Sequence, residues 1–126
     1  MMGMKLQEIK IKVTTIADGS GSNTSGRATF GLLYAVHWED TDFDGGVDAV
    51  ISTQNDLGSQ TLLTLTNADA DVKYHPRTLV DDEAGVALTG TQGGDRIMNV
   101  VAGELKLAVT SGGNTKSGTV ILYVFE

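Results

Sequence analysis

The sequence contains no cysteine and a single proline, Pro76. The lack of thiols excludes disulfides, zinc sites with cysteine ligands and thiol catalysis. No apolar run approaches the ~20 residues that a membrane-spanning helix needs. The N-terminal stretch MMGMKLQEIK also lacks the apolar core of a signal peptide. The sequence therefore predicts a protein that is made and kept in the cytoplasm and has no membrane partner.

Basic residues are also scarce, with 9 Lys and Arg against 16 Asp and Glu and a formal net charge of −7. Proteins that bind nucleic acid usually carry the opposite charge, so no nucleic-acid partner is expected. No Lys or Arg occurs between Arg27 and Lys73, whereas acidic residues recur there. This pattern fits a solvated acidic surface. It also fits a polar assembly unit, in which the basic N-terminal strand of one copy meets the acidic flank of another.

Alternation of apolar and polar residues with a period of two runs through most of the chain and predicts β-strands. Ile9, Ile11 and Val13 share one face of the first such segment. The strongest segment is 28–39. Its alternation predicts one buried face that includes Trp38 and a second, largely apolar face. The first of these faces holds Phe30, Leu32, Tyr34, Val36 and Trp38, and the second holds Leu33, Ala35 and His37.

No segment of ten or more residues has a helical period, and 16 glycines separate short runs. The expected fold is all-β, an antiparallel β-sandwich of jelly-roll type with about seven or eight strands, forming one domain over residues 1–126. Segments 28–39 and 46–54 are expected to pair as a long hairpin. Residues 77–95 are expected to form a long excursion with one turn of helix. Further strands are predicted at 61–67, 71–76, 96–111 and 119–125.

The stretch DTDFDGGVD, residues 40–48, resembles the start of a calcium-binding loop. Asp40, Asp42, Asp44 and Asp48 occupy ligand positions, but Ile51 stands where a bidentate acid is needed. Asp and Gly also gather at hairpin tips because both tolerate turn geometry. The loop is therefore interpreted as a hairpin tip, with weak calcium binding as the alternative.

No other pattern suggests catalysis or a cofactor. His37 and His75 lie far apart in the sequence, and no nucleophile elbow or phosphate-binding loop occurs. The glycine-rich stretches 90–95 and 111–118 are interpreted as turns. The sequence thus predicts a protein that is not an enzyme and binds no cofactor.

The last strand is apolar on both faces, although one face of a small sandwich is normally wet. Val120, Leu122 and Val124 can fill the core. The candidates for a subunit interface are the remaining apolar residues, Ile121, Tyr123, Phe125 and Leu33. Alternatively, the excursion 77–95 folds over this face.

An ordered set of short motifs resembles a known group of proteins. LLTLTNA is followed by YHPR, residues 74–77, and then by VAGELKLAVTSGGNTKSGTVILYVFE at the end of the chain. This order is similar to that of small β-rich structural proteins of tailed bacteriophages and prophages, which look like capsid decoration, or cement, proteins. The resemblance covers residues 27–126 and does not include the acidic loop.

The resemblance implies a non-enzymatic virion component that is assembled in the host cytoplasm. It further implies that the chain forms a homo-oligomer and binds the major capsid protein of the phage. The alternative from the residues alone is a small β-sandwich binding module for a carbohydrate or protein ligand. Exposed aromatic side chains would favour the carbohydrate ligand.

Overall fold

The computed structural model describes residues 5–55, 58–79, 84 and 96–126. This part of the chain contains eight β-strands and no helix. None of its elements is a helix long and apolar enough to cross a membrane. The strands are β1 (Leu6–Thr14), β2 (Gly21–Asp40), β3 (Asp48–Asn55), β4 (Gly58–Leu65), β5 (Val72–Tyr74), β6 (Arg77–Leu79), β7 (Arg96–Thr110) and β8 (Ser117–Phe125).

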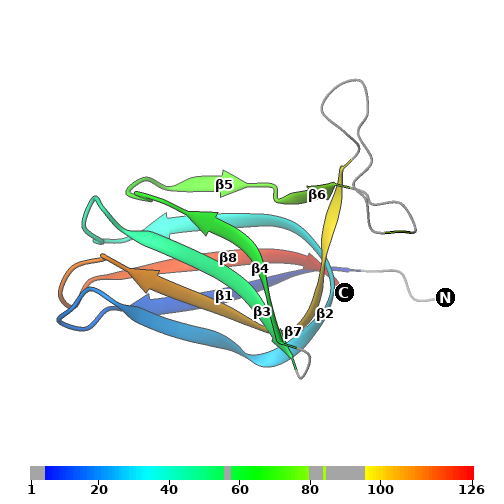
Figure 1. Cartoon of the computed structure of the whole chain (residues 1–126), viewed down its shortest axis with the longest axis horizontal. Coiled ribbons are helices and arrows are strands. Elements are labelled where there is room, and N and C mark those ends of the chain that lie inside the picture. Colours follow the sequence, from blue (N-terminus) through cyan, green and yellow to red (C-terminus); the bar gives the residue numbers. More distant parts are fainter. Residues whose placement is uncertain (1–4, 56–57, 80–83, 85–95) are drawn as a thin grey trace.

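All strand pairs are antiparallel, and the order along the main sheet is β1-β8-β2-β7-β3-β4. The long strand β2 belongs to two parts of this sheet. Its first part, up to Leu33, pairs with β7, and its second part, from Leu32 onward, pairs with β8 and, at its far edge, with β5. Figure 1 shows β2 curving round one end of the molecule between these two parts. The all-β antiparallel prediction is confirmed, and the order β1-β8-β2-β5 opposite β2-β7-β3-β4 agrees with a jelly-roll sandwich.

One cluster of apolar side chains fills the space between the two parts of the sheet. The alternation read from the sequence places its members correctly in β1, β7 and β8, because every second residue of a strand points to the same face. Phe43 and Val47 add to the cluster from the loop between β2 and β3. The members of the cluster from β1, β7 and β8 are Ile9, Ile11 and Val13, then Val101, Leu105, Leu107 and Val109, then Val120, Leu122 and Val124.

Strand β2 departs from simple alternation, and part of its predicted facing is wrong. Trp38 and Val36 are buried as expected, but Phe30 is 67% exposed and Tyr34 is 40% exposed. The register of β2 against β8 shifts between Leu33 and Ala35. An extra residue at such a bulge turns the side chains that follow it to the other face of the sheet. Phe30, before the bulge, and Trp38, after it, therefore point to different faces.

The predicted hairpin between segments 28–39 and 46–54 is also wrong. β2 ends beside β8, whereas β3 pairs with β4 and β7. The acidic loop 41–47 therefore passes from one part of the sheet to the other. The predicted turn of helix within 77–95 falls largely on residues 80–83 and 85–95, which lie outside the described part of the chain, and residues 77–79 form β6.

The two ends of the molecule differ in what they present. β1 begins, β8 ends and β2 bends at one end, whereas the loops 15–20, 41–47 and 111–116 gather at the other (Figure 1). Backbone hydrogen bonds between Lys5 and Glu126 fasten the first of these ends. The loop 111–116 joins the other two at the second end: Gly112 donates to the Gly19 oxygen, and Asp44 donates to the Gly112 oxygen.

Candidate functional site

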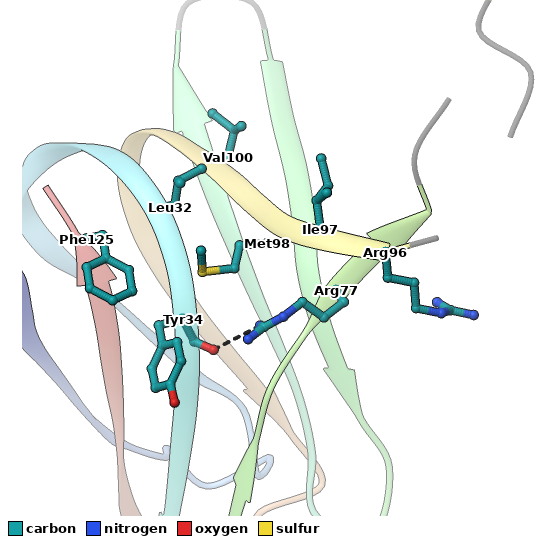
Figure 2. Close-up of a pocket in the computed structure, with 8 residues that line it drawn as sticks. All are labelled: Leu32, Tyr34, Arg77, Arg96, Ile97, Met98, Val100 and Phe125. Carbon is teal, nitrogen blue, oxygen red and sulfur yellow. Dashed lines mark hydrogen bonds between the residues drawn. The ribbon is translucent and has the colours of Figure 1, made fainter. Parts of the chain in front are cut away.

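The bend of β2 carries an open apolar groove of about 590 Å³. Its walls come from β2, from the first residues of β7 and from the last residue of β8, and β6 closes one side (Figure 2). The lining residues are Leu32, Tyr34, Arg77, Arg96, Ile97, Met98, Val100 and Phe125.

The pairing of the strands explains why these side chains meet. Leu32 lies opposite Val100 on β7 and opposite Phe125 on β8, at the point where β2 exchanges one neighbour for the other. Side chains directly opposite one another in an antiparallel pair lie on the same face. The bend therefore brings apolar residues from three strands together on the outside of the sheet.

Tyr34 and Arg77 form an ordered wall of the groove. The Arg77 guanidinium donates to the backbone oxygens of Tyr34, at 2.9 Å, and of Pro76, at 2.7 Å. It also lies 5.8 Å from the centre of the Tyr34 ring. The Tyr34 ring in turn meets Phe125 and His75 edge-on, with centroids 5.7 and 5.6 Å apart. These contacts hold the wall in one arrangement before any partner arrives.

The apolar surface extends beyond the groove. Val100 is 57% exposed and Ile97 is 53% exposed. Phe30, the most exposed aromatic residue, lies opposite Ala102, two residues along the strands from the Leu32–Val100 pair and on the same face. Scattered apolar residues on a surface are ordinary, but a contiguous group of them marks a candidate interaction site.

The four residues predicted from the sequence as interface candidates have different surroundings. Leu33 is fully buried. It cannot line an interface, because the bulge after it leaves both Leu33 and Val36 facing the core. Ile121 is also buried, between its strand neighbours Lys10 and His37. Tyr123 is half-buried under the ammonium group of Lys73, at 5.5 Å, and Phe125 is half-buried in the groove.

The acidic loop uses its carboxylates to hold backbone N–H groups. Asp40 accepts from the N–H of Phe43 at 2.7 Å, and Asp42 accepts from that of Ser117 at 2.6 Å. Asp48 accepts from the N–H of Asn67 at 3.0 Å. Each of these bonds satisfies a backbone donor with a carboxylate oxygen. The Phe43 ring, inserted by the loop, stacks on Trp38 with centroids 5.6 Å apart.

The weak-calcium interpretation of Asp40, Asp42, Asp44 and Asp48 stays a prediction. Ile51 at the last ligand position is fully buried. In the described ranges, no three His, Asp or Glu side chains form a group that could hold a metal ion. We expect at most millimolar affinity, so that about 5 mM calcium raises stability by no more than roughly 1 kcal/mol and the melting temperature only modestly. Thermal melting with and without calcium measures this, with Asp42→Asn as the control. A large rise that Asp42→Asn abolishes would establish a metal site.

Asp40 gives a pH-dependent prediction. Burial raises the pKa of this carboxyl, the N–H of Phe43 opposes the rise, and Asp71, Asp69 and Asp42 add to it. Because the folded-state pKa lies above the unfolded one, the stabilising contribution of Asp40 is complete below its ordinary pKa of 3.8 and is lost as the pH rises through the folded value.

Asp40→Asn keeps an acceptor for the N–H of Phe43 and removes the charge. We expect this variant to melt at a higher temperature than the parent at about pH 7 and at the same temperature near about pH 3. Melting curves followed by circular dichroism at both pH values give the comparison. A lower melting temperature at neutral pH would mean that the charged hydrogen bond outweighs burial and repulsion.

The histidines do not converge on a common site. His37 lies 3.4 Å from Glu39 on the outer face of β2, whereas His75 lies beside Tyr34 at the groove. Sequence reasoning missed most of the groove, including Leu32, Met98, Val100 and both arginines. The apolar residues on both faces of β2 and β8 were the sequence feature that predicted an interface. Of the interface candidates predicted from them, only Phe125 lines the groove.

Comparison with known proteins gives no family. No family of known proteins matches the sequence, and no curated protein sequence matches it. Among solved structures, the chain is similar to the infectious bursal disease virus VP2 subviral particle, with 15% identity and a TM-score of 0.21. The match covers 94% of this chain and 37% of that one, so the chain spans little more than a third of that neighbour. At this TM-score the likeness carries no weight for fold or function.

Proposed function

We propose that the chain is a non-enzymatic phage virion component, a capsid decoration protein that binds the major capsid protein and other copies of itself. The observation that carries the proposal is the exposed apolar surface at the bend of β2. The ordered motifs from LLTLTNA to the last strand support the phage assignment through their resemblance to decoration proteins. The virion, assembled in the host cytoplasm, is the corresponding location.

The groove has the composition of a protein-binding surface. Aromatic residues, Met and Arg are enriched at protein interfaces, and the groove holds Tyr34, Phe125, Met98, Arg77 and Arg96. Arg77 and Tyr34 are already fixed by their mutual contacts. Side chains that are ordered before binding lose less entropy when a partner arrives. A surface of this kind suits a contact that forms once and persists in an assembled particle.

A small binding module is the second candidate, and the groove itself favours it. A volume of about 590 Å³ lies within the range of ligand sites, and the lining is mostly apolar with two cations, Arg77 and Arg96. Tyr34 and Phe125 meet edge-on. Neither ring stands free as a flat platform of the kind that carbohydrates stack on, so a protein segment is the better ligand for the groove itself. Phe30, 67% exposed beyond the groove, is the ring of this face that favours a carbohydrate ligand.

Co-sedimentation tests the proposed function. Heads purified from the phage that encodes the chain, made with its gene deleted, are mixed with the purified chain and spun through sucrose. We expect saturable binding to the heads that Val100→Asp abolishes. Val50→Asp is the matched control, because Val50 is 37% exposed on β3, opposite Ala108 and far along β7 from the groove. A parent chain that stays in the supernatant, or a Val100→Asp variant that binds as well as the parent, would refute the proposal.

A further inference from the structure

The loop 15–20, at the end of the molecule remote from the groove, presents an isolated apolar side chain. Ile16 is 62% exposed, and Asp18 stands two residues after it. Asp42 and Asp44 are exposed at the same end, where Lys116 is half-buried. This end therefore combines one apolar projection with several carboxylates.

The turn that carries Ile16 is rigid. The N–H of Ile16 bonds to the Ser20 oxygen at 2.9 Å, and the N–H of Gly19 bonds back to the Ile16 oxygen at 3.0 Å. Asp18 accepts from both the N–H and the hydroxyl of Ser20, at 3.0 and 2.6 Å. These bonds lower the pKa of the Asp18 carboxyl from its ordinary value, which already lies well below neutral pH. An apolar side chain on an ordered turn can enter a pocket at little entropic cost.

The groove has the complementary character. It is apolar, and two guanidinium groups, Arg77 and Arg96, stand at its edge. Arg96 is exposed, and neither arginine faces a carboxylate within the described residues. Among the described residues, the bonds of the Arg77 guanidinium go to the backbone oxygens of Tyr34 and Pro76 and to no carboxylate. The groove thus suits an apolar side chain accompanied by a negative charge.

The two surfaces cannot meet within one molecule. β1 begins beside Phe125, since Leu6 lies opposite it, and runs away from the groove to the turn that carries Ile16. β1 runs from Leu6 to Thr14, which is roughly 26 Å at the usual rise per residue, and Ile16 lies two residues beyond its end. Any contact between the surfaces must therefore join two copies of the chain.

We propose that the groove receives the Ile16 turn of a second copy, with Asp18 of that copy facing Arg77 and Arg96. This inference rests on the proposed function, because it names the partner that occupies part of the same surface. The contact joins two different patches, so it is heterologous and builds a ring or an open row of copies rather than a two-fold dimer. Facing grooves would place like-charged arginines together, which disfavours the two-fold alternative.

A contact made by one turn and one groove is small, so we expect weak association, with a dissociation constant on the order of micromolar or above. Sedimentation velocity of the purified chain up to about 500 μM covers this range. The parent is expected to show a rising average mass. Ile16→Ser and Val100→Asp should each remain monomeric, whereas Val72→Ser, at a residue 38% exposed on β5, should behave as the parent.

Mixing the two defective variants distinguishes the geometry. Ile16→Ser keeps an intact groove, and Val100→Asp keeps an intact turn, so a mixture should form 1:1 heterodimers that grow no further. Association of the parent should also weaken between about 0.1 and about 1 M NaCl, because the Debye length falls from roughly 10 to 3 Å. Circular dichroism melts of each variant establish that it is folded.

Three results would overturn the inference. These are self-association of Ile16→Ser equal to that of the parent, absence of heterodimers in the mixture, and a parent chain that is monomeric throughout. If such a chain still binds heads, only the head-to-tail contact fails. If it neither self-associates nor binds heads, the proposed function fails as well.

Discussion

Trp38→Ala is expected to lower the free energy of unfolding by about 3–5 kcal/mol, the range for removing a large aromatic side chain from a packed core. Trp38 is fully buried, and its ring stacks on Phe43. Its indole N–H donates to the Ala68 oxygen at 2.8 Å, and the substitution leaves that acceptor without its partner. Urea denaturation followed by circular dichroism measures the change.

Phe30→Ala is the matched control for this experiment. Both aromatic residues lie on β2, eight positions apart, so uninterrupted alternation would put them on the same face. Phe30 is nevertheless 67% exposed. Exposed substitutions usually change stability by no more than about 0.5 kcal/mol. Equal losses for the two variants would mean that β2 alternates without interruption and that the bulge between Leu33 and Ala35 is absent.

Gly31→Ala is expected to destabilise the fold by about 1–3 kcal/mol or more, because it forces a backbone to move. A methyl group at this position would overlap the backbone oxygen of Phe125 and lie 2.9 Å from its carbonyl carbon. Gly31 stands where β2 passes from β7 to β8, so the two backbones must approach closely there. The same denaturation measurement applies.

Gly46→Ala provides the comparison for Gly31. A methyl group at Gly46 meets no atom within 4 Å, so we expect a change near zero. If Gly31→Ala were as stable as Gly46→Ala, the ends of β8 and the bend of β2 would be farther apart than the structure has them. Since Phe125 lines the groove, Gly31→Ala should also weaken binding to heads.

The alternation of apolar and polar residues alone is sufficient to place most of the core. Ile9, Ile11 and Val13 in β1 and Val120, Leu122 and Val124 in β8 are buried as predicted. In a strand with one buried face, the alternation of its own residues predicts which side chains point to the core. The prediction fails in β2, where burial depends on pairing with β8, a strand more than eighty residues away.

The candidate site could not be predicted for the same reason, because it depends on pairing between strands that are distant in the sequence. The groove forms because Leu32 lies opposite both Val100 and Phe125. The residues of β2 alone do not predict either of these pairings. The prediction that the acidic loop is a hairpin tip is wrong for a related reason. Its composition favours a turn, but composition does not reveal that β2 and β3 join different neighbours.

The composition of purified virions tests the central claim most directly. The proposed function requires that a phage or induced prophage encodes the chain. Particles of that phage are banded in a density gradient, and the chain is quantified in them by mass spectrometry against the major capsid protein. The account predicts that the chain is present in a fixed ratio to that protein, and that virions made with Val100→Asp contain far less of it, while those made with Val50→Asp match the parent. Absence of the parent chain from purified virions would contradict the account.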